Sequence, residues 1–233
     1  MKRLAMAGAI SAQKADDPLI GVKIGAKELF GQCMAAVHDD RGVHAETLLC
    51  VLGAISGFAC PAAIAEQLAL KGLTPPQVGI MVVEGADGRT YWFGDPVNHL
   101  LAEDHYAVWP LIAGKAQALG VTHFPDAANA MQHVAATVGG ADFGIPRLPE
   151  GHRPALLPID AARAVWPTAR AIMIRYCDEL REWPLLAALA AQEGQETVRD
   201  SLDPAIAATI LLECAFPMAK LAPGSLGLSQ PVG

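Results

Sequence analysis

The chain has 233 residues, of which 24 are Asp or Glu and 17 are Lys or Arg, and its formal net charge is −7. Lys and Arg nowhere form the positive cluster that phosphate contacts need, which argues against nucleic-acid binding. Hydrophobic residues make up 52% of the chain but aromatic residues only 6%, and this excess of alanine, leucine and small residues favours closely packed helices. Because only 18% of the residues are charged, we expect a second copy of the chain to cover some apolar surface.

Cysteine content and apolar runs bear on where the protein resides. The five cysteines are odd in number and form no C-x-x-C pair, which predicts reduced thiols in a cytoplasmic protein. Residues 1–10 resemble a short signal peptide, but charge resumes at Lys14, so secretion is the alternative. Residues 47–65 carry no charge and are long enough to span a bilayer. Pro61 interrupts this run and no Lys or Arg cluster flanks it, so we predict a buried core helix and no membrane.

The expected fold is mainly α, with a single helical domain over residues 26–220. An irregular segment over residues 1–25 precedes it, and an extended tail over 221–233 follows it, either covering a neighbour or disordered. Residues 139–158 are dense in glycine and proline and predict a linker or binding loop. Hydrophobic periodicity predicts helices over residues 26–38, 45–59, 110–119, 125–138, 160–182, 184–192 and 204–216, with a further helix starting at Pro61.

One central β-hairpin is expected over residues 78–93. Two runs rich in β-branched and aromatic residues flank the turn sequence Gly85-Ala86-Asp87-Gly88. Two strands alone are barely stable in water, so the hairpin must lie on helices, pair with another short strand, or pair with a second copy of itself. 

Asp-Pro pairs predict two helix starts, one at Asp95 and one at Asp203. In each, the carboxylate is expected to cap free N–H groups while proline takes the first helical position.

The first polar cluster contains His38, Asp39, His44 and Glu46 within nine residues. Such imidazoles and carboxylates could hold a divalent metal that activates a water molecule. The alternative, which we favour and which assigns no metal, is a solvated turn at Asp39 followed by a helix that starts near His44 and Glu46.

The second polar cluster follows the hairpin and contains Asp95, Asn98 and His99. These groups would crowd the positive end of a helix, which suits a polar ligand, although capping alone explains Asp95. Cys60 precedes Pro61, where a helix start would favour a thiolate. A buried structural thiol is the alternative, and we favour it.

We predict that the two clusters meet. A helix that is apolar all round must have its first turn covered, so His44 and Glu46 should need hydrogen-bond partners, which Asp95, Asn98 and His99 could supply in one semi-buried site. The function expected is that of a homo-oligomeric binding or assembly protein with a polar pocket for a small ligand. The alternative is a small hydrolase, with or without a metal, that uses the histidines and carboxylates of these clusters. No motif in the sequence names a cofactor.

Overall fold

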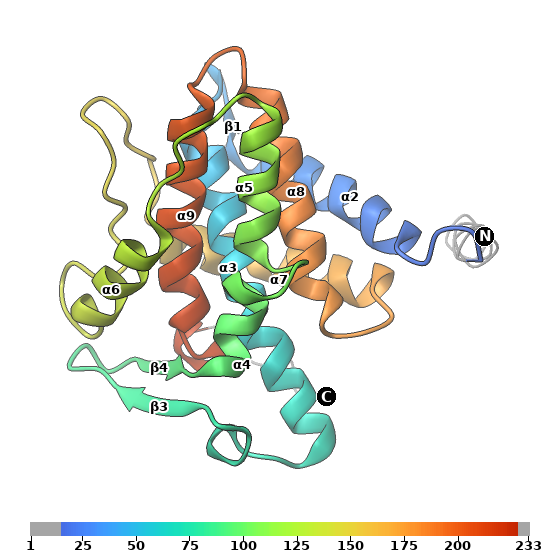
Figure 1. Ribbon diagram of the computed structural model, residues 1–233, viewed down its shortest axis with the longest axis vertical. Helices are drawn as coiled ribbons and strands as arrows, with labels where there is room; N and C mark the ends of the chain where they lie inside the picture. Colours follow the sequence, from blue (N-terminus) through green and yellow to red (C-terminus); the bar gives the residue numbers. More distant parts are fainter. Residues whose placement is uncertain (1–14, 228–233) are drawn as a thin grey trace.

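The computed structural model describes residues 15–227, and within them the chain is mainly α-helical with a β-hairpin, as predicted. Helix α3 runs through the centre, and α7, α8 and α9 pack around it (Figure 1). By length and composition α3 could cross a membrane, but 94% of its most apolar 18-residue window is buried inside the fold, so it serves as a core helix. The helices of the bundle are α2 (Ile20–Val37), α3 (Ala45–Lys71), α5 (Val108–Ala118), α6 (Ala127–Thr137), α7 (Pro158–Tyr176), α8 (Glu182–Val198) and α9 (Pro204–Lys220).

Small residues let α3 and α9 approach closely. A Cβ atom at Gly53 would lie 2.9 Å from the carbonyl oxygen of Leu211, and a Cβ atom at Gly57 would clash with the carbonyl oxygen of Ala215. Since only glycine leaves room for this backbone contact, the two positions fix how the two most buried helices cross.

The predicted break at Pro61 is wrong, because α3 continues through this residue to Lys71. Proline inside a helix removes one hydrogen bond and usually ends or kinks it. Here residues from Thr47 to Ile64 are buried on all sides, so the packing of α7, α8 and α9 around α3 outweighs the local cost. Helix α3 ends instead at Gly72, which takes the left-handed conformation with φ 62°.

The predicted start of the first helix is also wrong, because α2 begins at Ile20 and not at residue 26. Glycines at 21 and 25 lower the local helix propensity, yet both are buried. A Cβ atom at Gly25 would lie 2.6 Å from Leu186 and 2.8 Å from Tyr176. Tertiary packing on α7 and α8 therefore forms this first turn. Residues 1–14, which include the signal-like stretch, lie outside the described residues.

The hairpin consists of β3 (Met81–Glu84) and β4 (Thr90–Phe93), paired antiparallel beneath the end of α9 (Figure 1). The chain after α9 returns to β4, where Leu221 forms a bridge with Tyr91. The short helix η3 (Pro223–Leu226) follows, and Leu226 is fully buried. The expected tail over 221–233 therefore packs on its own chain as far as residue 227, and residues 228–233 lie outside the described part. A second, minimal hairpin joins β1 (His38–Asp39) to β2 (Gly42–Val43).

Candidate functional site

A carboxylate lies between two imidazoles at the start of α3. Glu46 Oε1 is 3.0 Å from Nδ1 of His152, and Glu46 Oε2 is 3.3 Å from Nε2 of His44. The Glu46 side chain is only 13% exposed. His152 belongs to the glycine- and proline-rich segment 139–157, so this contact ties that segment to the central helix.

Thr47 completes the hydrogen bonding of this cluster. Its Oγ1 accepts the backbone N–H of Ala155 at 2.9 Å and lies 2.8 Å from Nδ1 of His44. The His44 ring thus contacts Glu46 through Nε2 and the Thr47 hydroxyl through Nδ1. Burial raises the pKa of the Glu46 carboxyl, but the His152 hydrogen bond and the two nearby imidazoles outweigh it, and the net pKa lies below its usual value.

His38 and Asp39 do not join this cluster. Both are exposed in β1, and Asp39 accepts the backbone N–H of Arg41 at 2.8 Å. This hydrogen bond is the main cause that holds the pKa of the Asp39 carboxyl below its usual value. These residues form the solvated turn that was the alternative to a metal site.

The segment after the hairpin forms the short helix α4 (Asp95–Asn98), which continues into a single π-helical turn, η2 (His99–Glu103). Gly94 occupies the N-cap with φ 135°, and no side chain caps this helix. The predicted capping by Asp95 is therefore wrong, and that carboxylate is exposed in the first turn. The equivalent prediction for Asp203 is confirmed, since its Oδ1 accepts the N–H of Ala205 at 2.7 Å.

Asn98 and His99 face different surroundings. His99 Nε2 forms an exposed pair with Asp104 at 3.1 Å. Asn98 Oδ1 instead accepts a hydrogen bond from Nζ of Lys220 at 2.5 Å. Lys220 is the last residue of α9, so Asn98 joins the post-hairpin segment to the end of that helix.

Lys220 is a buried cation that the sequence analysis missed. Lys220 is 2% exposed, and its Nζ lies 5.6 Å from the ring centroid of Phe93. Burial lowers the pKa of Lys220 to about 8, although the nearby carboxylate of Glu103 acts in the opposite direction. A lysine within the apolar run 214–222 was the available signal, because such a residue is rarely buried without a partner.

Cys60 is a structural thiol. It lies in the interior of α3 and not at a helix start, since the helix does not break at Pro61. The side chain is fully buried, its Sγ contacts the carbonyl oxygen of Ser56 at 3.8 Å, and burial raises its pKa to about 12. A thiol with this pKa stays protonated at neutral pH and is a poor nucleophile.

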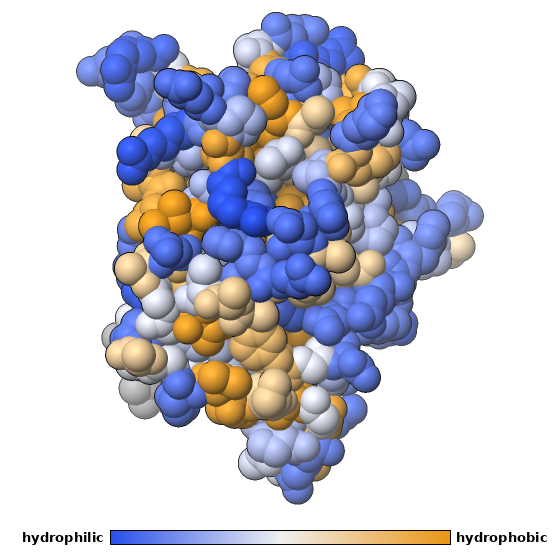
Figure 2. All heavy atoms as spheres, turned by 60° about the vertical axis from the view of Figure 1, so that its left-hand side comes forward, coloured by the Kyte–Doolittle hydropathy of each residue, from blue (hydrophilic) through white to orange (hydrophobic). Residues whose placement is uncertain are grey.

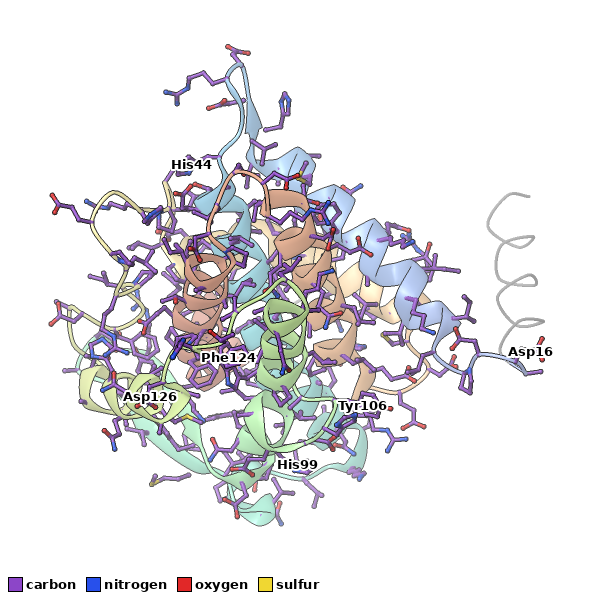
Figure 3. The ribbon with its side chains drawn as sticks, turned by 45° about the horizontal axis from the view of Figure 1, so that its top comes forward. Asp16, His44, His99, Tyr106, Phe124 and Asp126 are labelled. Carbon is purple, nitrogen blue, oxygen red and sulfur yellow. The ribbon has the colours of Figure 1, made fainter. Side chains whose placement is uncertain are left out.

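The predicted meeting of the two clusters is not what the structure shows. Figure 3 places His44 and His99 at opposite ends of the bundle. Cys60, a neighbour of Lys220, lies about 20 Å beyond Glu46 along α3. Between residues 15 and 227, no group of three or more His, Cys, Asp or Glu side chains has the geometry to hold a metal ion. The histidines and carboxylates therefore form separate, internally paired clusters.

A second buried charge holds the segment 139–157 in place. Glu213 of α9 is 9% exposed and accepts the backbone N–H of Arg147 at 3.1 Å and its Nη2 at 2.7 Å. Nη1 of Arg147 also donates to Asn129 of α6 at 2.9 Å. With the His152 and Ala155 contacts, this pair makes the segment a fixed strap across α3, α6 and α9.

Two hollows lie between helices on the surface. One of about 420 Å³ lies between α2 and α7, and one of about 450 Å³ lies between α2, α5 and α8. Charged side chains at both are already paired, Arg175 with Glu28 and Lys115 with Glu196, each at 2.5 Å. Neither hollow is lined by any of the predicted site residues, so a small polar ligand stays a prediction.

The outer strand of the hairpin exposes apolar side chains. Met81 is 61% exposed and Val82 is 40% exposed, while Tyr91 and Trp92 of β4 are buried. Hydrophobic residues gather on the lower part of the face in Figure 2, where the hairpin lies. In the described part of the chain, β3 pairs with β4 alone, so its other edge is open.

Comparison of the chain with family models, with curated proteins and with solved structures gave no significant match.

Proposed function

We propose that this protein is a homo-oligomeric binding or assembly protein, and that a second copy of the chain is its first partner. The observation that carries the proposal is the open edge of β3, with Met81 and Val82 exposed beside it. A strand edge offers unpaired N–H and C=O groups to another chain, and proteins that stay monomeric usually protect it with lysine, proline or a bulge.

The strand β3 lacks these protective features. Its four residues are Met81, Val82, Val83 and Glu84, and its pairing with β4 is regular along its whole length. Glu84 is the single charge, and both its carboxylate oxygens lie 3.1 Å from Oγ1 of Thr90, on the neighbouring strand β4. The edge is therefore accessible to another strand.

The proposal places the protein in a reducing compartment, the cytoplasm, without nucleic acid or membrane as a partner. Cys33, Cys50, Cys60 and Cys214 are free thiols, and all four are buried. Acidic residues exceed basic ones by 24 to 17, which disfavours contacts with phosphate or with anionic lipid. The most apolar helix is used in the core.

The hydrolase alternative has less support. It requires a general base and its partner groups within hydrogen-bond reach of one substrate. His44 and His99 lie at opposite ends of the bundle (Figure 3). His44 is paired with Glu46, His99 with Asp104 and Asn98 with Lys220, so each group is already engaged with its own neighbour.

Light scattering coupled to size-exclusion chromatography tests the proposal. We expect the purified full-length protein to move from the mass of one chain toward that of two as its concentration rises from micromolar to near-millimolar. A mass of one chain throughout this range would overturn the proposal.

A further inference from the structure

The hydrogen bonds of Thr90 reveal which backbone groups of the hairpin face outward. Thr90 donates its N–H to Oγ of Ser225 at 2.7 Å, and its carbonyl oxygen accepts the N–H of Ala222 at 3.0 Å. Both partners belong to the chain that returns after α9. The backbone N–H and C=O of Thr90 therefore point away from β3, and Thr90 and its register partner Glu84 form a non-hydrogen-bonded pair.

Hydrogen-bonded and non-hydrogen-bonded pairs alternate along an antiparallel ladder. Val83 and Met81 consequently form the hydrogen-bonded pairs with β4, while Val82 and Glu84 direct their N–H and C=O groups to the open side. No strand of residues 15–227 lies on that side of β3. The open edge of β3 therefore presents two backbone N–H donors and two backbone C=O acceptors in a row, next to the exposed side chains of Met81 and Val82.

We propose that this edge pairs antiparallel with the same edge of a second copy, so that Val83 faces Val83 of the partner subunit across a two-fold axis. The inference rests on the proposed self-association and specifies its surface. In this register Val82 and Glu84 of one copy exchange backbone hydrogen bonds with Glu84 and Val82 of the other. All the outward groups of both strands are then satisfied, and the two hairpins form one four-stranded sheet.

Neighbouring registers are less favourable. Centring the pair on Glu84 would set two carboxylates directly opposite each other, which is destabilising. Centring it on Val82 would require the N–H of Ile80, which already donates to the carbonyl oxygen of Pro75 at 3.1 Å. The register centred on Val83 avoids both costs.

The size of the contact sets its strength. A strand pair this short buries less than the roughly 800 Å² per partner of a standard interface. The exposed Met81 and Val82 add apolar area but no large hydrophobic core. We therefore expect a dimer that dissociates on dilution, with a dissociation constant in the micromolar range or weaker.

A cysteine scan tests the pairing and its register. In an antiparallel non-hydrogen-bonded pair the opposed Cβ atoms lie about 4.5–5.5 Å apart, close enough for a disulfide with a small adjustment. The variant Val83→Cys should form a covalent dimer under mild oxidation at least about tenfold faster than Met81→Cys, because Met81 would face Gly85 of the partner subunit. Met81 is the more exposed of the two residues, so random collision would give the opposite order. The unsubstituted chain gives the background from its own thiols.

A second variant keeps the test independent of cysteine chemistry. Val82→Pro removes an N–H that points to the open side, so the ladder with β4 keeps its hydrogen bonds. We expect it to weaken the dimer at least about tenfold, since each interface loses two hydrogen bonds, while circular dichroism stays that of the parent. A dimer that survives Val82→Pro and cross-links no faster through Val83→Cys than through Met81→Cys would overturn the strand pairing but not self-association. A chain that is monomeric at all concentrations would overturn both.

Discussion

Val82 and Trp92 are register partners in the hairpin, yet Trp92 is 8% exposed and Val82 is 40% exposed. The inner strand is covered by the bundle and by the chain that returns after α9, whereas the outer strand has one open edge among the described residues. This asymmetry is the basis of the functional proposal. The further contacts of the fold lead to predictions that can be tested on the purified chain.

The close crossing of α3 and α9 predicts opposite effects for two glycine substitutions. Gly57→Ala should lower the free energy of unfolding by about 3 kcal/mol or more, because its Cβ would clash with the backbone carbonyl of Ala215. Gly31→Ala in α2 has no heavy atom within 4 Å of its new Cβ and should raise stability by about 0.5–1 kcal/mol. Urea unfolding of both variants measures the difference. Equal effects would show that the helices do not approach as described.

Arg147 and Glu213 form the buried pair that anchors the segment 139–157, so replacing Arg147 should strongly lower the free energy of unfolding. Arg147→Ala would leave Glu213 buried without its cation, and we expect a loss of about 2–4 kcal/mol in the free energy of unfolding. Limited proteolysis should then cut between residues 139 and 157 faster than in the parent. Arg41→Ala is the matched control, because Arg41 pairs with Asp39 at the exposed surface. If both variants behave alike, the strap is not held by this pair.

Replacing His152 and replacing His99 by alanine should lower the free energy of unfolding by different amounts. His152→Ala removes a hydrogen bond to Glu46, whose side chain is 13% exposed, and should cost about 1–2 kcal/mol. His99→Ala removes an exposed pair with Asp104 and should cost less than about 0.5 kcal/mol. Thermal unfolding of the two variants in parallel provides the comparison. A larger loss for His99→Ala would contradict the placement of these residues.

Lys220 predicts a pH dependence of stability with a definite sign. Its pKa is about 8 in the folded chain against the ordinary lysine value of 10.5, so between these pH values the unfolded chain binds more protons. Burial of the charged Lys220 therefore lowers the free energy of unfolding most below pH 8. This destabilisation decreases as the pH rises through 8 and is absent above pH 10.5. The stability of the parent relative to Lys220→Met should therefore rise by about 2.5 kcal/mol between pH 7 and pH 10.

Chemical unfolding of the parent and Lys220→Met at the two pH values measures this change. Lys71→Met, at an exposed position in the last turn of α3, should show no such change. A difference between parent and Lys220→Met that is the same at both pH values would show that Lys220 is not buried as a cation.

Local patterns predicted the hairpin and the Asp203 cap, because turn chemistry and capping act between residues close in sequence. The continuation of α3 through Pro61 could not be predicted in this way, since it depends on packing by helices that follow much later in the chain. The same limit applies to the polar clusters. Glu46 has a partner 106 residues away in His152, and Asn98 has one 122 residues away in Lys220. The need for partners at the start of an apolar helix suggested that the two clusters lie together, but about half the length of α3 separates them.

Backbone amide exchange measured by NMR tests most directly whether the open β3 edge is the surface of self-association. At low concentration the N–H groups of Val82 and Glu84 should exchange quickly, while those of Met81 and Val83, bonded to β4, stay protected. At high concentration the Val82 and Glu84 amides should become protected as well, with half-protection at the concentration where light scattering finds half of the chains paired. Rapid exchange of Val82 and Glu84 at every concentration, in a chain that light scattering shows to be dimeric, would contradict the account.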